Sequence, residues 1–227
     1  MKTACFRGKG LWFGWAALLA VAGVLLSQAC AAQCAARNSG ACSSGAPKCE
    51  WTPLFNGTDL DGWMTEGNAA WRVEDGCIVG TQGPGNAPGD LFTEKEYGDF
   101  EVRITYKIQW PANSGIWFRY QSPDKSYQAD ILEYKDPECY SGTLYCPAKM
   151  FLSMNEDPNL EKRDDWNTMI IRAEGDHLTV TLNGTVVGDV HDASYATGRI
   201  GFQVHPGDEF KDMKITVREA AIREVKP

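Results

Sequence analysis

Histidine is scarce in this chain of 227 residues, and several common sequence features are missing altogether. There are 3 histidines and no two cysteines with C-x-x-C spacing, so disulfides are a better interpretation of the cysteines than a zinc site. The net charge is −8 and no run of Lys or Arg occurs, which argues against nucleic acid or an anionic membrane surface as a partner. No stretch has a long helical period, so neither a helical bundle nor an α/β fold with helical crossovers is expected.

The first 31 residues have the order of features that is typical of an export signal. Three basic residues lie within the first nine, residues 11–26 are apolar and almost uncharged, and Ala29-Cys30-Ala31 offers small residues for cleavage. We therefore expect residues 1–31 to be a signal peptide and the protein to be periplasmic or extracellular. A retained membrane anchor is the alternative. Cys30 also leaves a lipoprotein signal and a lipid anchor open, although Ser27 stands where Leu is usual.

The eight cysteines fit an oxidising compartment. Residues 32–50 form a tail rich in Ala, Ser and Gly that contains Cys34, Cys42 and Cys49. Cys139 and Cys146 flank a short Tyr-Ser-Gly-Thr-Leu-Tyr segment. We expect these two cysteines to form a disulfide that closes a loop beside the functional site.

Short runs with a two-residue period predict that residues 51–227 form one all-β domain. Asn183-Gly184 separates two such runs and is a strong signal for a hairpin. About ten strands with turns at short intervals favour a two-sheet β-sandwich. The clearest expected strands are Phe100–Ile108, Ile116–Tyr120, Gln128–Tyr134, Met169–Ala173, Leu178–Leu182, Val186–Val190, Arg199–Val204 and Met213–Arg218.

Three of these strands place polar and aromatic side chains on one face, because alternate residues of a strand share a face. Their neighbours along each strand are apolar and can fill the core. The mixture suits a carbohydrate, whose ring faces stack on aromatic groups and whose hydroxyls need donors and acceptors. An ordinary solvated sheet face is the alternative for any one of them. The residues are Trp117, Arg119, Gln128, Asp130, Gln203 and His205.

Six segments, in this order along the chain, resemble one family. They are Leu54-Phe55-Asn56-Gly57-Thr58-Asp59-Leu60-Asp61-Gly62-Trp63, Trp71-Arg72-Val73-Glu74-Asp75-Gly76, Glu96-Tyr97-Gly98-Asp99-Phe100-Glu101-Val102, Asn113-Ser114-Gly115-Ile116, Trp166-Asn167-Thr168, and Ile200-Gly201-Phe202-Gln203 followed by His205. Together, across residues 52–218, they resemble the 3-keto-disaccharide hydrolase domain.

The resemblance implies a concanavalin A-like jelly roll that cleaves glycosides carrying a ketone at C3. Such a ketone acidifies the C2 proton, so a base can form an enolate whose collapse expels the anomeric oxygen; water then adds to the enone. His205 is then the base or a ligand, Arg119 stabilises the enolate oxygen, and Asp130 is the acid or a metal ligand. Whether a divalent metal ion takes part is left open. The further candidate sugar-binding residues are Asn113, Trp117, Gln128, Tyr145 and Gln203.

One strand departs from the family pattern. The usual Y-E-x-Q-I appears here as Tyr127-Gln128-Ala129-Asp130-Ile131, so an amide stands in the Glu position and an acid in the Gln position. Gln128 cannot act as a base or an anionic ligand, which makes a non-catalytic, lectin-like module the main alternative. A classical retaining glucanase is a weaker one. Such enzymes line up E-x-D-x-E on one strand face, whereas Asp130 and Glu133 are three residues apart.

Overall fold

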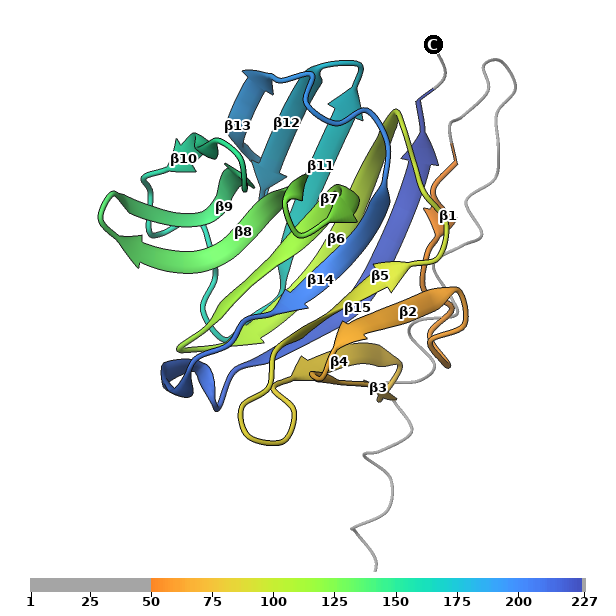
Figure 1. Ribbon diagram of the computed structural model, residues 1–227, viewed down its shortest axis with the longest axis vertical. Coiled ribbons are helices and arrows are strands. Elements are labelled where there is room, and N and C mark those ends of the chain that lie inside the picture. The colour runs from red at the N-terminus through yellow and green to blue at the C-terminus, as the bar shows by residue number, and fades with distance from the viewer. Residues whose placement is uncertain (1–49, 226–227) are drawn as a thin grey trace, which may run out of the picture. The chain divides into compact units, whose positions relative to one another are not determined.

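Two antiparallel β-sheets face each other in the computed structural model, which describes residues 50–225 (Figure 1). The predicted all-β sandwich is confirmed. The structure also has strands that were not predicted, because their sequences show no clear alternation of apolar and polar residues. The elements are β1 Thr52–Pro53, β2 Trp63–Gly67, β3 Ala70–Glu74, β4 Cys77–Thr81, β5 Gly89–Thr93, β6 Phe100–Gln109, β7 Asn113–Ser122, β8 Lys125–Lys135, β9 Glu138–Cys146, β10 Met150–Asn155, β11 Asn167–Glu174, β12 His177–Leu182, β13 Thr185–His191, β14 Arg199–Val204, the 3₁₀ turn η1 Asp208–Phe210, and β15 Lys214–Glu224.

The sheets are assembled mainly from strands that are distant in sequence. The first sheet has the order β13-β12-β11-β6-β15-β4-β3, with β1 paired to β15, and the second has the order β10-β9-β8-β7-β14-β5-β2. Some neighbours are joined by hairpins. The one predicted at Asn183-Gly184 connects β12 to β13, and both turn residues have positive φ, 50° and 90°, as a primed turn requires.

Alternate residues of the central strands fill the space between the two sheets. In β6 these are Phe100, Val102 and Ile104, and in β8 they are Ala129 and Ile131; all five are fully buried. Burial stabilises the fold by roughly 1.5–3 kcal/mol for a side chain as large as Val, Ile or Phe. The intervening side chains therefore point away from the core, and on the second sheet they form the face that carries the candidate site.

The predicted disulfide between Cys139 and Cys146 is wrong. Both cysteines lie on β9, which pairs with β8 on one side and β10 on the other, so the segment between them is a strand and not a closed loop. Seven residues of extended chain span roughly 20 Å, whereas disulfide-linked Cα atoms lie within about 7 Å. Both thiols are free and buried.

The predicted signal peptide and cysteine-containing tail concern residues 1–50, and nearly all of that range lies outside the described residues. Between residues 50 and 225, no helix is long and apolar enough to cross a membrane.

Candidate functional site

A row of polar side chains crosses the outer face of the second sheet. Asp130 on β8 pairs with Gly115 on β7. Further along the sheet, Gln203 on β14 pairs with Asp90 on β5, which in turn pairs with Glu66 on β2. Because antiparallel partners point to the same face, the pairing collects side chains from residues 66 to 203 on one surface.

A second row lies two residues further along the same strands. Gln128 pairs with Tyr145 on one side and Trp117 on the other. The Gln128 side chain lies over Gly115 of the first row. A Cβ added at Gly115 would lie only 2.6 Å from the Gln128 amide group. From there its Nε2 donates a 3.1 Å hydrogen bond to Oε1 of Gln203. Gly115 thus provides the space in which the two glutamine amides meet.

These rows form the floor of an open pocket with a volume of about 260 Å³, which we call the first pocket. Of the eight predicted site residues, the structure brings seven together here, and Arg119 is the exception. The pocket also contains side chains that sequence reasoning missed. They come from β10, from the turns at Pro123 and Pro147, and from β8, where Leu132 and Tyr134 share the face of Asp130. The lining residues are Asn113, Trp117, Pro123, Gln128, Asp130, Leu132, Tyr134, Tyr145, Pro147, Met150, Phe151, Gln203 and His205.

Several polar groups of the first pocket have no partner in the protein. Within residues 50–225, the side chains of Asn113, Asp130 and Tyr145 make no hydrogen bond to another protein group. Burial raises the pKa of Tyr145, and the nearby Asp130 carboxyl acts in the same direction, so the phenol stays a donor. Asp130 is buried and the other two side chains are partly exposed, and buried polar groups normally have a hydrogen-bond partner. A ligand rich in hydroxyl and carbonyl groups would satisfy these three.

Asp130 is the most unusual of the three, because its side chain is almost completely withdrawn from water. The residue is 3% exposed. Burial raises the pKa of its carboxyl group well above the ordinary value. The protonated form is therefore favoured, and it can donate a hydrogen bond or a proton. This is the environment that a general acid needs.

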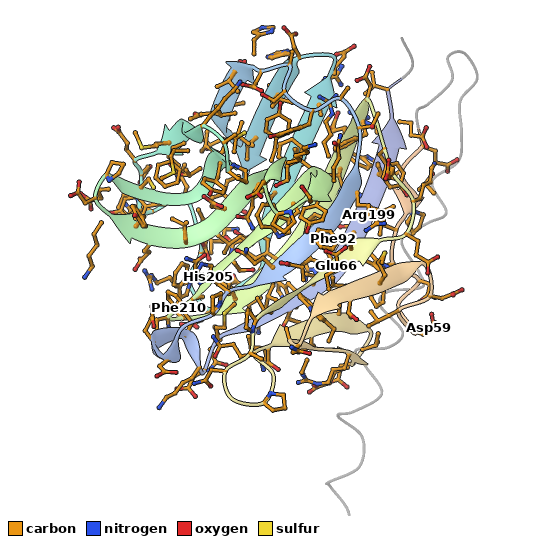
Figure 2. All side chains as sticks on the ribbon, viewed as in Figure 1. Asp59, Glu66, Phe92, Arg199, His205 and Phe210 are labelled. Carbon is orange, nitrogen blue, oxygen red and sulfur yellow. The ribbon has the colours of Figure 1, made fainter. Side chains whose placement is uncertain are left out.

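His205 lies just beyond β14 and is held from several directions. Its Nδ1 lies 2.7 Å from the carbonyl oxygen of Pro206, which can only accept, so Nδ1 carries a hydrogen and Nε2 is the nitrogen with a lone pair whenever the ring is neutral. The Phe210 ring packs edge-on against the His205 ring, with 5.8 Å between centroids. Figure 2 shows the two residues near each other. The Gln82 amide donates to the backbone oxygens of His205 and Gly207 at 2.8 and 3.0 Å. Gln82, from the β4–β5 loop, was not predicted.

The prediction that Arg119 lines the pocket is wrong. Regular pairing between β7 and β8 is interrupted between Phe118 and Ser122, and Arg119 has a φ of 46°, so the alternation used to assign its face fails there. The fully buried guanidinium donates to the backbone oxygens of Gly98, Gly175 and Tyr195 at 3.1, 2.8 and 3.0 Å.

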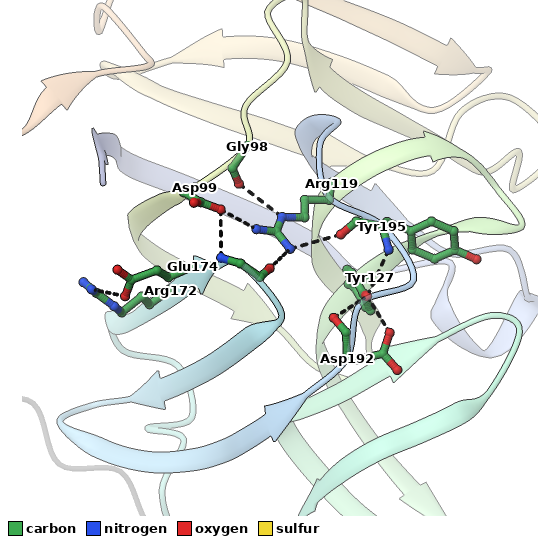
Figure 3. A network of polar contacts seen from close by, with 9 residues as sticks. Gly98, Asp99, Arg119, Tyr127, Arg172, Glu174, Asp192 and Tyr195 are labelled. Atoms are coloured by element: carbon green, nitrogen blue, oxygen red, sulfur yellow. Dashed lines mark hydrogen bonds and ion pairs between the residues drawn. The ribbon is translucent and has the colours of Figure 1, made fainter. Parts of the chain in front are cut away.

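An ion pair completes the environment of Arg119. Its guanidinium lies 3.0 Å from the Asp99 carboxylate, which also accepts a hydrogen bond from the backbone of Gly175 (Figure 3). Arg119 thus ties together three chain segments that are distant in sequence. Its contacts are those of a structural residue.

The protein side chains of the first pocket do not form a usual metal-binding set. Within residues 50–225, no three His, Cys, Asp or Glu side chains are grouped closely enough to hold a metal ion. His205 and Asp130 are the members of those types that line the pocket.

Asp130 and Glu133, the candidate acids of a retaining glucanase, do not line the same pocket. Asp130 faces the first pocket, whereas Glu133 lines a separate polar cavity and forms an ion pair with Arg163. The face assignment made from the three-residue spacing is confirmed.

Comparison with known proteins identifies the family. A family model described as the 3-keto-alpha-glucoside-1,2-lyase-like domain matches residues 50–216. The chain belongs to this family. The 3-keto-disaccharide hydrolase of Bacteroides thetaiotaomicron is 34% identical over an alignment of 92 residues, and the match covers 35% of this chain and 31% of that protein. The match thus covers about a third of the relative, and the relative's activity is carried over below as a proposal.

Solved structures share the fold of this 3-keto-alpha-glucoside-1,2-lyase-like domain. A candidate glycosyl hydrolase from Parabacteroides distasonis has a TM-score of 0.59 at 20% identity, covering 78% of this chain and 95% of that one. A protein of unknown function with a galectin-like fold from Bacillus subtilis has a TM-score of 0.61 at 15% identity, covering 80% of this chain and 97% of that one. A carbohydrate-binding module from the same species has 0.52 at 16% identity, covering 72% and 96%. The concanavalin-like sandwich is confirmed.

Proposed function

We propose that this protein cleaves 3-keto-glycosides, including 3-keto-disaccharides, by elimination followed by hydration. One observation carries the proposal: a buried acid without a protein partner and a histidine with a free Nε2 line the same pocket. The family match supplies the substrate class. The predicted signal peptide supports the further proposal that the reaction takes place outside the cytoplasm.

The first step is removal of the C2 proton by Nε2 of His205. The C3 carbonyl makes this proton acidic, and the electron pair of the broken C–H bond moves into an enolate. The developing charge on the C3 oxygen needs donors. The Tyr145 hydroxyl and the Asn113 amide line the pocket without protein partners, so they are available for this task. They take the role that sequence reasoning had given to Arg119.

The second step is loss of the substituent at C1. The enolate electrons form the C1–C2 double bond while the C1–O bond breaks, and Asp130 donates its proton to the departing oxygen. The leaving sugar is released as an alcohol, and the ring becomes an enone. Burial favours protonated Asp130, so the acid is in the correct form before the reaction begins.

Hydration restores both catalytic groups. Asp130, now a carboxylate in a buried position, removes a proton from water while the hydroxide adds to C1, and His205 returns its proton to C2. The products are a free 3-keto-sugar and the alcohol, so the net reaction consumes one water molecule. The same burial that makes Asp130 an acid in the second step makes its carboxylate a base in the third.

Apolar and aromatic side chains at the edge of the first pocket suit the faces of a sugar ring. Tyr134 is 42% exposed and Met150 is 55% exposed, which is unusual for side chains of this size. Phe151 packs edge-on against both Tyr134 and Tyr145 at 5.6 and 6.1 Å, so the aromatic groups support one another. These packed rings form a preorganised surface on which a sugar ring can stack.

The proposal is tested by supplying a 3-keto-disaccharide and recording the enone absorbance and the release of reducing sugar. His205→Gln and Asp130→Asn should each lower turnover by about 100-fold or more, because each removes one proton-transfer group. His191→Gln is the matched control, since His191 lies at the end of β13 and contacts Asp176. A wild-type protein that binds the sugar but forms neither product would refute the proposal and favour the lectin-like alternative.

A further inference from the structure

A second hollow opens beside the first pocket on the same face of the second sheet. Its volume is about 350 Å³, and we call it the second pocket. The two pockets share Pro123 and Gln203, so Gln203 stands at the boundary between them. The second pocket is lined by Glu66, Gly67, Pro88, Gly89, Asp90, Tyr120, Pro123, Gln203, Val204 and Pro206.

Trp117 and Asp90 connect the two pockets. The Trp117 side chain lines the first pocket, and its Nε1 donates a 3.0 Å hydrogen bond to Oδ1 of Asp90 in the second. The other carboxylate oxygen of Asp90 makes no hydrogen bond within residues 50–225. It is available as an acceptor for a ligand hydroxyl in the second pocket.

The side chains next to Asp90 in the second pocket are fixed in place by contacts with one another. Glu66 accepts hydrogen bonds from the Tyr120 hydroxyl at 3.0 Å and from Arg199 at 3.1 Å. The Tyr120 ring stacks on Phe92 with 3.9 Å between centroids. Figure 2 shows Glu66, Phe92 and Arg199 close together on this part of the sheet. A preorganised wall reduces the loss of side-chain entropy when a ligand binds.

We propose that the second pocket binds the departing sugar of a disaccharide, while the first pocket binds the 3-keto ring; this inference rests on the function proposed above. The glycosidic oxygen then lies near Gln203, between the pockets. The volumes of the two pockets, about 260 and 350 Å³, lie close to the lower end of the ~300–1,000 Å³ range of small-molecule sites, which fits one sugar ring in each better than two. A two-ring substrate needs both.

Charge limits what the departing group can be. Arg199 offsets the charge of Glu66, whereas Asp90 has no cationic partner within residues 50–225. Burial raises the pKa of Asp90 to about 6, and the Trp117 hydrogen bond acts in the opposite direction. Above that pH the carboxylate attracts hydroxyl donors and repels anions. The second pocket therefore selects a neutral sugar over a phosphorylated or carboxylated one.

The test compares a 3-keto-disaccharide with the corresponding methyl 3-keto-glycoside, whose leaving group cannot reach the second pocket. In Asp90→Leu, kcat/KM for the disaccharide should fall by about ten-fold or more, as expected for loss of a hydrogen bond to a charged group. For the methyl glycoside it should stay within about two-fold of wild type in Asp90→Asn, which still offers Trp117 of the first pocket an acceptor. Asp90→Asn is the second variant, because its side chain still accepts the Trp117 hydrogen bond and the protein should therefore fold even if Asp90→Leu does not. It should also lower kcat/KM for the disaccharide more than for the methyl glycoside, but by a smaller factor than Asp90→Leu. Asp61→Leu, at an exposed position, is the matched control.

The outcomes separate this inference from the proposed function. Equal losses on both substrates in Asp90→Asn, or no loss on either in Asp90→Leu, would overturn the second pocket as a sugar subsite while the cleavage reaction stands. Failure of the wild-type protein to cleave either substrate would overturn the proposed function and this inference with it. Preferential loss on the disaccharide supports both.

Discussion

Glu161 offers a direct test of the electrostatics of this fold, away from both pockets. It lies in the small polar cavity beside Trp110 and Tyr140, where the Ser141 hydroxyl donates to one carboxylate oxygen. The other oxygen is buried and has no hydrogen-bond partner within the described residues. Burial raises the pKa of Glu161 from 4.5 to about 7, against the opposing effects of the Ser141 hydrogen bond and of the nearby Trp110 indole. The charged form is thus disfavoured in the folded protein.

The pH dependence follows from the direction of this shift. Between pH 4.5 and 7 the folded state holds a proton on Glu161 that the unfolded state has released. The contribution of this group to stability is therefore fully present below pH 4.5 and is lost as the pH rises to about 7. A shift of about 2.5 units corresponds to about 3 kcal/mol, at 1.36 kcal/mol per unit.

Glu161→Gln removes the ionisation and keeps the shape of the side chain. At pH 8 the variant should be more stable than wild type by up to about 3 kcal/mol, which corresponds to a rise in Tm of roughly 6–12 °C for a domain of this size. At pH 4 the two proteins should unfold alike. Urea unfolding at both pH values measures the difference, with the exposed Glu156→Gln as the control. A gain of equal size at both pH values, or no gain at pH 8, would refute the electrostatic argument.

Two further substitutions test the structural assignments made for β7. Arg119→Met should lower the free energy of unfolding by about 3–5 kcal/mol, because Asp99 and three carbonyl oxygens lose their donor. The folded fraction should keep its turnover at 25 °C. Lost turnover at unchanged stability would instead indicate that Arg119 takes part in the reaction. Gly115→Ala should displace the Gln128 side chain, raise KM for the keto-sugar and lower stability by about 1–3 kcal/mol. Gly188→Ala is the control, because a Cβ there would contact Val180 at 3.4 Å, and it should change KM little. Unchanged KM in Gly115→Ala would show that the glutamine pair does not shape the pocket.

Strand periodicity was sufficient to place most of the site. Parity along β8 and β14 correctly assigned Asp130 and Gln203 to the outer face, because both strands are regular there and their apolar neighbours are buried. The same parity failed for Arg119, where an irregularity in β7 turns the side chain away. No periodic signal reveals such a break from within a single strand.

Other features could not be read from the sequence for different physical reasons. β9 was interpreted as a loop because its Ser, Gly and Thr residues hide the apolar alternation, and Gly142 with a φ of 93° marks an irregularity within it. Asp90 alternates with buried Leu91 on β5, a signal that was present but short. The place of Asp90 in the second pocket depends on its pairing with Gln203 of β14, which is more than a hundred residues away in sequence.

The exchange of acid and amide on β8 has a consequence for the geometry of the proposed reaction, relative to the family pattern that this strand resembles. Gln128 occupies the position where the family pattern has Glu, and Asp130 supplies the carboxyl group two residues later. Two residues of strand correspond to about 7 Å. The register of β7 with β8 and β14 makes this a displacement towards the end of the sheet that carries His205. A sugar held between the acid and the histidine must therefore sit further along the cleft than it would against a Glu at position 128. A transition-state analogue shaped for that other arrangement would contact this protein's glutamine pair instead of its acid.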